Sequence, residues 1–169
     1  MLALQSITPA VADSFREVRL RALQDAPAAF CSTYAQEARL TPDDWQRRAN
    51  QWTSEQAIAY LALDGQTAQA IAASIIDPDN SARAYLRSMW VAPPYRTCGV
   101  GKQLVEAIAE WATAKQASSL YLDVTSNNEA AIAFYHRLGF VKTGHTEPYP
   151  NNAKLTVYEM VRQLACRTD

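Results

Sequence analysis

Arg96-Thr97-Cys98-Gly99-Val100-Gly101 is the stretch of this chain that decides its fold. It follows an apolar, strand-like run over residues 85–91 and a Pro-Pro pair, and it opens an amphipathic helix. Two glycines let a backbone approach a ligand closely and leave successive N–H groups unblocked. Free N–H groups at a helix N-terminus attract anions, chiefly phosphate, and an arginine adds a fork-shaped donor. The segment therefore predicts a strand, a phosphate-binding turn and a helix.

Two other phosphate loops and a plain turn compete with this interpretation. A P-loop requires a hydroxyl residue after its Gly-Lys pair, but Gln103 follows Gly101 and Lys102. A dinucleotide-binding loop requires a third glycine where this chain has Leu104, and an acidic residue on a second strand that is not found. On the loop alone, glycines that only relieve backbone strain stay an open alternative.

Composition narrows the class of protein. The chain has 169 residues, of which 49% are hydrophobic and 20% charged, as in one globular domain. A formal net charge of -1, without a block of like charge, argues against nucleic acid as the main partner. We find no apolar run long enough for a membrane and no signal-peptide pattern at the N-terminus. Cys31, Cys98 and Cys166 have neither disulfide nor metal-ligand spacing, so we expect the cytoplasm and no metal.

The remaining elements follow from hydrophobic periodicity and turn residues such as the Asp64-Gly65 hairpin signal. Strands are expected at 2–7, 56–63, 66–76, 82–91, 120–124, 140–146 and 155–160, and helices at 9–24, 33–40, 41–52, 100–115 and 128–138. A polar, proline-rich loop is expected between the last two strands. This order indicates a mixed α/β domain with parallel pairing around the 100–115 helix.

A second motif follows the first, Asn128-x-x-Ala131-Ile132-x-Phe134-Tyr135-x-x-x-Gly139-Phe140. On a helix, Asn128, Ala131 and Tyr135 lie along one face. The small Ala131 permits close approach of an elongated ligand, and Tyr135 places a phenol near the end of the helix. Taken alone, the two aromatic residues are more typical of a hydrophobic core.

The two motifs, in their order, spacing and flanking strands, resemble the GCN5-related N-acetyltransferase (GNAT) superfamily. There an Arg-x-x-Gly-x-Gly loop holds the pyrophosphate of acetyl-CoA, and an Asn…Tyr…Gly-Phe segment lies beside the pantetheine and the sulfur. Met89-Trp90-Val91 matches the bulged fourth strand of that family, and the specific match covers residues 85–141. The resemblance implies a single domain over 1–169: a mostly antiparallel mixed sheet of six to seven strands, flanked by helices, with a parallel pair splayed at the acetyl-CoA site.

The loop departs from the family at one place. Many relatives have glycine after the tyrosine-arginine pair, whereas Thr97 and Cys98 follow Arg96 here. Because the arginine and both glycines of the motif are kept, we still expect the loop to form. Thr97 gives up some backbone freedom and could add a hydroxyl contact.

The resemblance also implies roles for the matching residues. The backbone N–H of Val91 would polarise the thioester carbonyl, and Tyr135 would donate a proton to the departing sulfur. Asn128 would hydrogen-bond the pantetheine arm, and Arg137 or Lys102 would meet the 3′-phosphate. The cofactor-binding set expected in this way is Met89, Trp90, Val91, Arg96, Thr97, Cys98, Gly99, Val100, Gly101, Lys102, Asn128, Ala131, Tyr135 and Arg137.

The general base and the acceptor pocket are less determined. Glu37, Asp123 and Glu159 are candidate bases, and Glu37 is the one we expect to be catalytic. Each carboxylate could instead be an ordinary surface group, and a chain of water molecules could remove the proton. The resemblance places the acceptor among Phe30, Tyr34, Glu37, Trp45 and Trp90, together with residues 145–152. Aromatic rings beside an acid suit a cationic amine, but the same rings could simply pack helices onto the sheet.

We therefore expect an acetyl-CoA-dependent N-acetyltransferase that acts on the primary amine of a small molecule in the cytoplasm. Acetylation of a protein or peptide is one alternative. A non-catalytic acyl-CoA-binding module is another. Neither nucleic acid nor membrane is expected as a partner, and a homodimer is left open.

Overall fold

A computed structural model describes residues 1–150 and 152–165, so the predictions that involve Asn151 and Cys166 lie outside the described residues. The strands are β1 (Ala3–Ser6), β2 (Ala57–Asp64), β3 (Thr67–Ile76), β4 (Arg83–Val91), β5 (Ser119–Thr125), β6 (Val141–Tyr149) and β7 (Asn152–Gln163). The α-helices are α1 (Ala12–Asp25), α2 (Tyr34–Glu37), α3 (Pro42–Gln51), α4 (Val100–Ala114) and α5 (Glu129–Arg137). Short 3₁₀ turns are η1 (Pro9–Val11), η2 (Pro27–Ala29) and η3 (Pro93–Tyr95).

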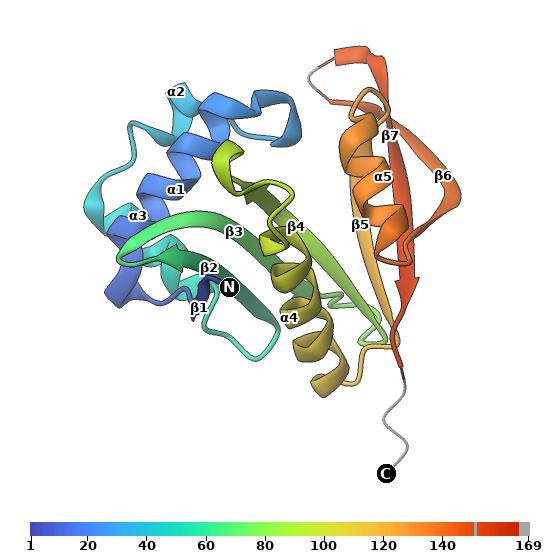
Figure 1. The fold of residues 1–169 in the computed structure, drawn as a ribbon, viewed down its shortest axis with the longest axis horizontal. Helices are drawn as coiled ribbons and strands as arrows, with labels where there is room; N and C mark the ends of the chain where they lie inside the picture. Colours follow the sequence, from blue (N-terminus) through green and yellow to red (C-terminus); the bar gives the residue numbers. More distant parts are fainter. Residues whose placement is uncertain (151, 166–169) are drawn as a thin grey trace.

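The seven strands form one mixed sheet in the order β1-β2-β3-β4-β5-β7-β6. Every neighbouring pair is antiparallel except β4 and β5, which run parallel. Their pairing covers only Arg83–Tyr85 opposite Ser119–Tyr121, and beyond it the two strands diverge (Figure 1). The predicted fold class is therefore confirmed, including the splayed parallel pair.

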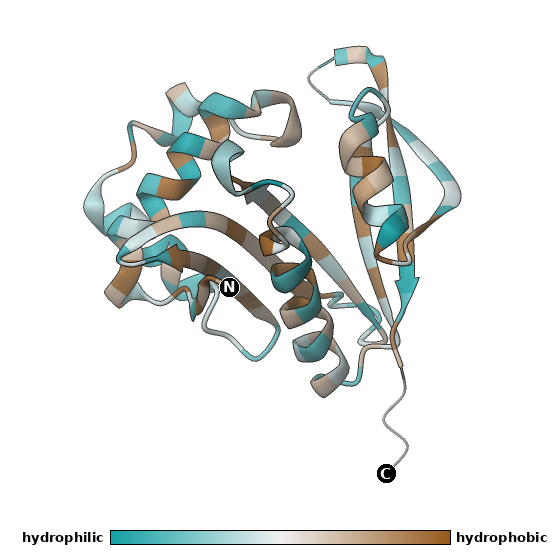
Figure 2. Cartoon of the chain, in the orientation of Figure 1, coloured by the Kyte–Doolittle hydropathy of each residue, from teal (hydrophilic) through white to brown (hydrophobic). Residues whose placement is uncertain are grey.

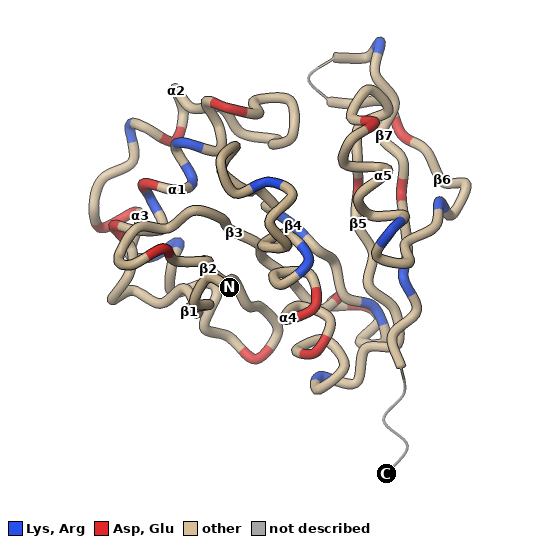
Figure 3. Tube along the Cα trace, in the orientation of Figure 1, with Lys and Arg blue, Asp and Glu red and all other residues tan. Residues whose placement is uncertain are grey.

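Two hydrophobic clusters hold the layers together. Helix α4 buries Val100, Leu104 and Ile108, which recur at helical spacing, against one face of the sheet together with residues of β5 and α5. Helices α1 and α3 bury Phe15 and Trp45 on the opposite face. Apolar residues concentrate along the strands between these layers (Figure 2), and charges of both signs are interspersed over the surface elements (Figure 3). In the described part of the chain, the helices are too short or too polar to cross a membrane.

The last hairpin differs from the sequence-based expectation. The polar segment expected as a loop is mostly strand, because Glu147 pairs with Val157 and Pro148 with Thr156. Proline is tolerated there because β6 is the edge strand and its outer side needs no ladder hydrogen bonds. Residues 147–149 at the end of β6 thereby reach the opening between β4 and β5.

Candidate functional site

A cleft of about 330 Å³ lies where β4 and β5 separate. Side chains alternate between the two faces of a strand, yet residues of both faces line this one cleft. Leu122 and Val124 come from the face that α4 and α5 cover, whereas Asp123 and Thr125 come from the opposite face. The cleft therefore gives access to both faces of the sheet at the point where the parallel pair opens.

A β-bulge in β4 shapes one wall of this cleft. Trp90 pairs with Ile71 and Arg87 with Ala73, so β4 has one more residue than β3 between these pairs. Ser88 takes up the extra length with a φ of 53°, in the left-handed region. The bulged strand that the sequence predicts at this position is confirmed. Met89, next to the bulge, lines the cleft.

The backbone of Val91 is free to face the cleft side of β4. The N–H of Ala92 donates to the carbonyl of Gln69 on β3 over 2.8 Å. Backbone N–H groups alternate in direction along a strand, so the N–H of Val91 points away from β3 and toward the β5 side. This is the orientation that a donor to a thioester carbonyl in the cleft requires.

The loop before α4 has the conformation of an anion-binding helix start. Gly99 is the N-cap with a φ of 83°, and the first amide to donate within the helix is that of Gln103. The N–H groups of residues 100–102 therefore lack intrahelical acceptors. Thr97 has a φ of 67°, which costs a β-branched residue about 1–2 kcal/mol.

Gly101 is required for close packing as well as for the loop. A Cβ atom there would lie 3.0 Å from Cζ of Phe134 and 3.3 Å from Cε of Met89. The glycine thus lets α4 approach α5 and the bulged strand closely. The residues present fit a phosphate-bearing ligand with a narrow arm.

The side chain of Arg96 is already paired with protein groups. Its Nε donates to the carbonyl of Val91 over 2.9 Å, and its guanidinium forms an ion pair with Asp25. Asp25 also accepts from Trp90 Nε1 over 2.8 Å. These hydrogen bonds, from Trp90 first and Arg96 second, outweigh partial burial and lower the pKa of Asp25. Arg96 thereby ties the loop to β4 and to the last residue of α1, while contact with phosphate stays a prediction.

Tyr135 and Asn128 reach the cleft from α5. The ring of Tyr135 is more than nine-tenths buried and packs against Phe134 and Phe140 with centroids 5.1 and 5.6 Å away. Within the described residues its hydroxyl forms no hydrogen bond, and burial raises its pKa, so the phenol stays protonated. Asn128 caps α5 by accepting from the N–H of Ala131 over 3.2 Å, and both residues line the cleft.

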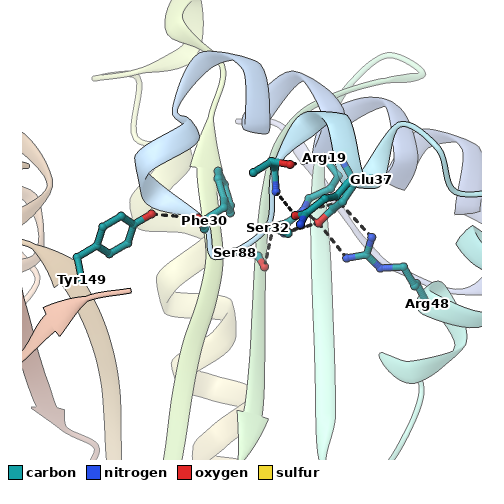
Figure 4. A network of polar contacts seen from close by, with 9 residues as sticks. Arg19, Phe30, Ser32, Glu37, Arg48, Ser88 and Tyr149 are labelled. Carbon is teal, nitrogen blue, oxygen red and sulfur yellow. Dashed lines mark hydrogen bonds and ion pairs between the residues drawn. The ribbon is translucent and has the colours of Figure 1, made fainter. Parts of the chain in front are cut away.

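Glu37 lies outside this cleft, in a buried network on the α1 side (Figure 4). It accepts from Arg19 at 2.9 Å, from Arg48 at 3.0 Å and from the hydroxyl of Ser32. Burial alone would raise its pKa, but these donors outweigh burial and lower the pKa of Glu37 to about 2. A carboxylate with its oxygens occupied and so low a pKa is a weak base. The contacts of Glu37 favour a structural role over the catalytic one.

The aromatic residues expected around the acceptor separate into two groups. Phe30 and Tyr149 line the cleft, whereas Tyr34 is 40% exposed outside it. Trp45 is buried against Phe15, and the indole of Trp90 is buried with the α1 side chains. The two tryptophans therefore pack the helices onto the sheet, which is the alternative that the sequence left open.

A hydrogen bond across the cleft joins segments that are far apart in the sequence. The hydroxyl of Tyr149, at the end of β6, donates to the carbonyl of Phe30 over 3.1 Å (Figure 4). The loop of Phe30 is itself held from behind, because Arg19 stacks over the ring at 4.5 Å and donates to Ser32 over 3.0 Å. This Tyr149–Phe30 bridge crosses the part of the cleft that residues 28–31 and 147–150 line. Sequence reasoning missed it, because neither residue type signals the contact.

Asp123 is the candidate base that does line the cleft. Burial, then the charges of Glu159 and Glu147, raise its pKa, while Arg87 and His145 lower it by a smaller amount. A carboxylate with a raised pKa is a stronger proton acceptor than an ordinary one.

The described residues contain no group of three His, Cys, Asp or Glu side chains arranged to hold a metal ion.

Lys102, Arg137 and Cys98, which the sequence also predicts to bind the cofactor, do not line the cleft. Arg137 is exposed in the last turn of α5, and Lys102 is exposed in the first turn of α4. Cys98 is a free, exposed cysteine in the loop, and Cys31 is a second one that lines the cleft. The bulged strand and α5 line one cleft, and the loop adjoins them where Gly101 packs against Phe134 and Met89. The roles of the single residues stay predictions.

Comparison with known proteins places this arrangement in a family. The chain is 32% identical over 102 residues to the peptidyl-lysine N-acetyltransferase YjaB of Escherichia coli, covering 57% of this chain and 54% of that protein. It spans about half the length of the curated relatives it matches first. A GNAT-family acetyltransferase structure from Streptococcus pneumoniae superposes with a TM-score of 0.80 at 23% identity, over 98% and 100% of the two chains.

A second structure was determined with a ligand. It is a Bacillus anthracis protein assigned as a streptothricin acetyltransferase, in complex with acetyl coenzyme A. It is 25% identical to this chain, with a TM-score of 0.61, and 67% of this chain aligns with 65% of it. The family model described as Acetyltransferase (GNAT) family matches residues 20–140, which include the bulged strand, the loop and α5. By its sequence, its sheet and its loop, the chain belongs to the GNAT family of acetyltransferases.

Proposed function

We propose that the chain is an acetyl-CoA-dependent N-acetyltransferase that acetylates the primary amine of a small molecule by direct attack. Residues 1–169 would form its single catalytic domain. Acetyl-CoA supplies an acetyl thioester, which is an activated acyl group with a thiolate as its leaving group. The N–H groups of residues 100–102, which lack intrahelical acceptors, support its binding at the start of α4.

The cofactor side of the cleft supplies the groups that assist the leaving thiolate. The N–H of Val91, which points away from β3, polarises the thioester carbonyl. The amide of Asn128 hydrogen-bonds the pantetheine arm. The hydroxyl of Tyr135 gives its proton to the departing sulfur, and its raised pKa keeps that proton in place beforehand.

The acceptor side of the cleft supplies the base. The amine must lose a proton before it attacks, and the carboxylate of Asp123 takes that proton directly or through one water. The new N–C bond then forms as the C–S bond breaks, and the sulfur leaves with the proton from Tyr135. The nitrogen loses its second proton on becoming an amide, and that proton returns to the tyrosinate of Tyr135 through water. Asp123 replaces Glu37 in this scheme because Asp123 lines the cleft and Glu37 is held by Arg19 and Arg48.

The observation that carries the choice of a small acceptor is the Tyr149–Phe30 bridge. A peptide would need an open groove across the sheet, whereas this bridge crosses the acceptor side of the cleft. The volume of about 330 Å³ also falls at the small end of ligand sites, which span roughly 300–1,000 Å³.

A thiol-release assay with acetyl-CoA tests the proposal directly. The panel holds small primary amines and lysine-containing peptides at matched concentrations, and the readout is kcat/KM for each acceptor. We expect turnover with small amines and little with peptides. Preferential use of peptides would replace the small-molecule proposal by the protein-acetylation alternative. Binding of acetyl-CoA without turnover of any amine would favour a non-catalytic module.

A further inference from the structure

The carboxylate of Asp25, the last residue of α1, connects that helix to the end of the bulged strand. One of its oxygens accepts from Trp90 Nε1 over 2.8 Å, and the same oxygen forms the ion pair with the guanidinium of Arg96. The Nε of Arg96 donates in turn to the carbonyl of Val91 over 2.9 Å. Hydrogen bonds to a carboxylate are stronger than those between neutral groups. Asp25 is therefore bound firmly to the residue before Val91 and, through one side chain, to Val91 itself.

The backbone ladder gives this part of β4 little support. Within the described residues, β4 beyond the bulge pairs with β3 only through Trp90 and Val91, and its pairing with β5 ends at Tyr85. A bulge also disrupts the ladder beside it. The peptide that carries the Val91 N–H thus lies at the end of a strand that is paired on one side. Its direction depends on the side chains that hold its neighbours.

The last turn of α1 holds Trp90 from a second direction. Arg21 lies one turn before Asp25, and its guanidinium carbon is 5.5 Å from the centroid of the Trp90 ring. Arg21 also donates to the carbonyl of Ala68 over 2.8 Å and to the side chain of Gln69 over 2.9 Å, both on β3. Trp90 is 6% exposed, so its indole is fixed by protein contacts. The end of α1 therefore anchors Trp90 and the adjoining part of the sheet together.

We infer that Asp25 is a positioning residue, which acts through Trp90 and Arg96 to direct the N–H of Val91 toward the thioester carbonyl. Trp90 precedes the peptide that carries this N–H, and Arg96 holds the carbonyl that follows it. A donor polarises a carbonyl only when the two are aligned, and a displacement of about 1 Å can cost a hundredfold in rate. The inference rests on the proposed function and adds to it a residue that lies outside the cleft.

The test observes the thioester carbonyl itself. Acetyl-CoA with an isotopic label at the acetyl carbonyl is bound to the protein without an acceptor, and difference infrared spectroscopy follows the carbonyl stretch. A hydrogen bond to the oxygen lowers this frequency. We expect a lower frequency on the wild-type protein than in buffer, and a return toward the free value on Asp25→Ala. The kcat of Asp25→Ala should fall about tenfold while the Kd of acetyl-CoA stays unchanged.

Three further variants separate positioning from a general loss of structure. Asp25→Asn keeps an acceptor oxygen and should recover part of both effects. Trp90→Phe keeps a buried ring without the N–H that reaches Asp25, so it should shift the stretch in the same direction by a smaller amount. Asp13→Ala, the matched control, removes an exposed carboxylate from the first turn of the same helix and should behave as wild type. Each variant is measured well below its thermal midpoint.

The outcomes separate the inference from the proposed function. An unchanged stretch in Asp25→Ala would overturn the inference even if kcat fell, and Trp90→Phe decides in the same way if Asp25→Ala does not fold. A weaker Kd with an unchanged kcat would also overturn it, because Arg96 would then serve cofactor binding. If the wild-type protein lowers the stretch but acetylates no amine, the proposed function fails, while a shift in Asp25→Ala still supports the positioning of Val91.

Discussion

The two sides of the cleft are built in different ways. The proposed cofactor side comes mainly from one continuous stretch, from the bulge at Ser88 to the first turn of α4, and it would act largely through backbone N–H groups. The proposed acceptor side is assembled from side chains of separate segments, namely residues 28–31, Asp123 and residues 147–150. A site built from backbone N–H groups needs glycine and strand residues at a fixed spacing, so the sequence alone can indicate it. A site built from side chains depends on which distant segments meet, so only the folded structure reveals it.

The largest effect on acetyl-CoA binding is expected from the variant Gly101→Trp. The new side chain would meet Phe134 and Met89 and would fill the space beside the start of α4. Acetyl-CoA at hundredfold excess over its Kd should stabilise the wild-type protein by about 2.7 kcal/mol, and the variant should show no such gain. Thermal midpoints with and without acetyl-CoA measure this effect. Ala114→Trp, at the exposed far end of the same helix, should keep the full shift.

The variant Glu37→Gln tests whether Glu37 has a structural role, holding Arg19 behind the loop of Phe30, rather than a catalytic one. Removing this carboxylate leaves Arg19 buried without its partner, which costs about 3–5 kcal/mol. Denaturant unfolding at pH 7 measures the loss. Glu55→Gln, which removes an exposed pair with Lys115, should change stability little.

The pH dependence of this loss provides a further check on Glu37. Its pKa in the folded protein is about 2, below the ordinary value of 4.5. The stabilisation is therefore complete above pH 4.5 and is lost as the pH falls toward 2. The difference between wild type and Glu37→Gln should shrink over that window. A constant difference would mean that the ion pairs do not account for it.

A smaller effect is expected from Tyr135→Phe, which removes only the proposed proton donor. The turnover number should fall about a hundredfold, with the KM for acetyl-CoA unchanged, as loss of general acid catalysis requires. Stability should hardly change, because the described residues offer the hydroxyl no hydrogen bond. Steady-state kinetics measure the effect, with Tyr60→Phe on β2 as the control. Undiminished turnover would remove Tyr135 from the acid role.

The sequence predicts the loop before α4 and its flanking elements well for a physical reason. Gly99 and Gly101 have conformational and steric requirements that few other residues meet, so their spacing identifies the turn. The apolar period of α4 and the cap at Asn128 then place the flanking helices. Thr97 departs from the family pattern expected from the sequence, and it adopts a φ in the left-handed region that glycine takes without strain.

The acceptor side could not be predicted in the same way. Glu37 beside aromatic residues resembles a cation pocket, but Arg19 and Arg48 come from other helices and occupy its oxygens. The Tyr149–Phe30 bridge spans 119 positions of sequence. Such contacts depend on where the last hairpin lies relative to the cleft, and local sequence patterns do not predict that position.

The most direct test of the central claim, that one cleft takes cofactor and acceptor on opposite sides, uses Asp123→Asn. We measure the Kd of acetyl-CoA by calorimetry and kcat/KM for a small amine across pH. The account predicts an unchanged Kd, a kcat/KM about a hundredfold lower, and loss of the limb on which the rate falls as acid protonates the base. Equal losses in cofactor binding and turnover, or full turnover with the acid limb intact, would contradict it.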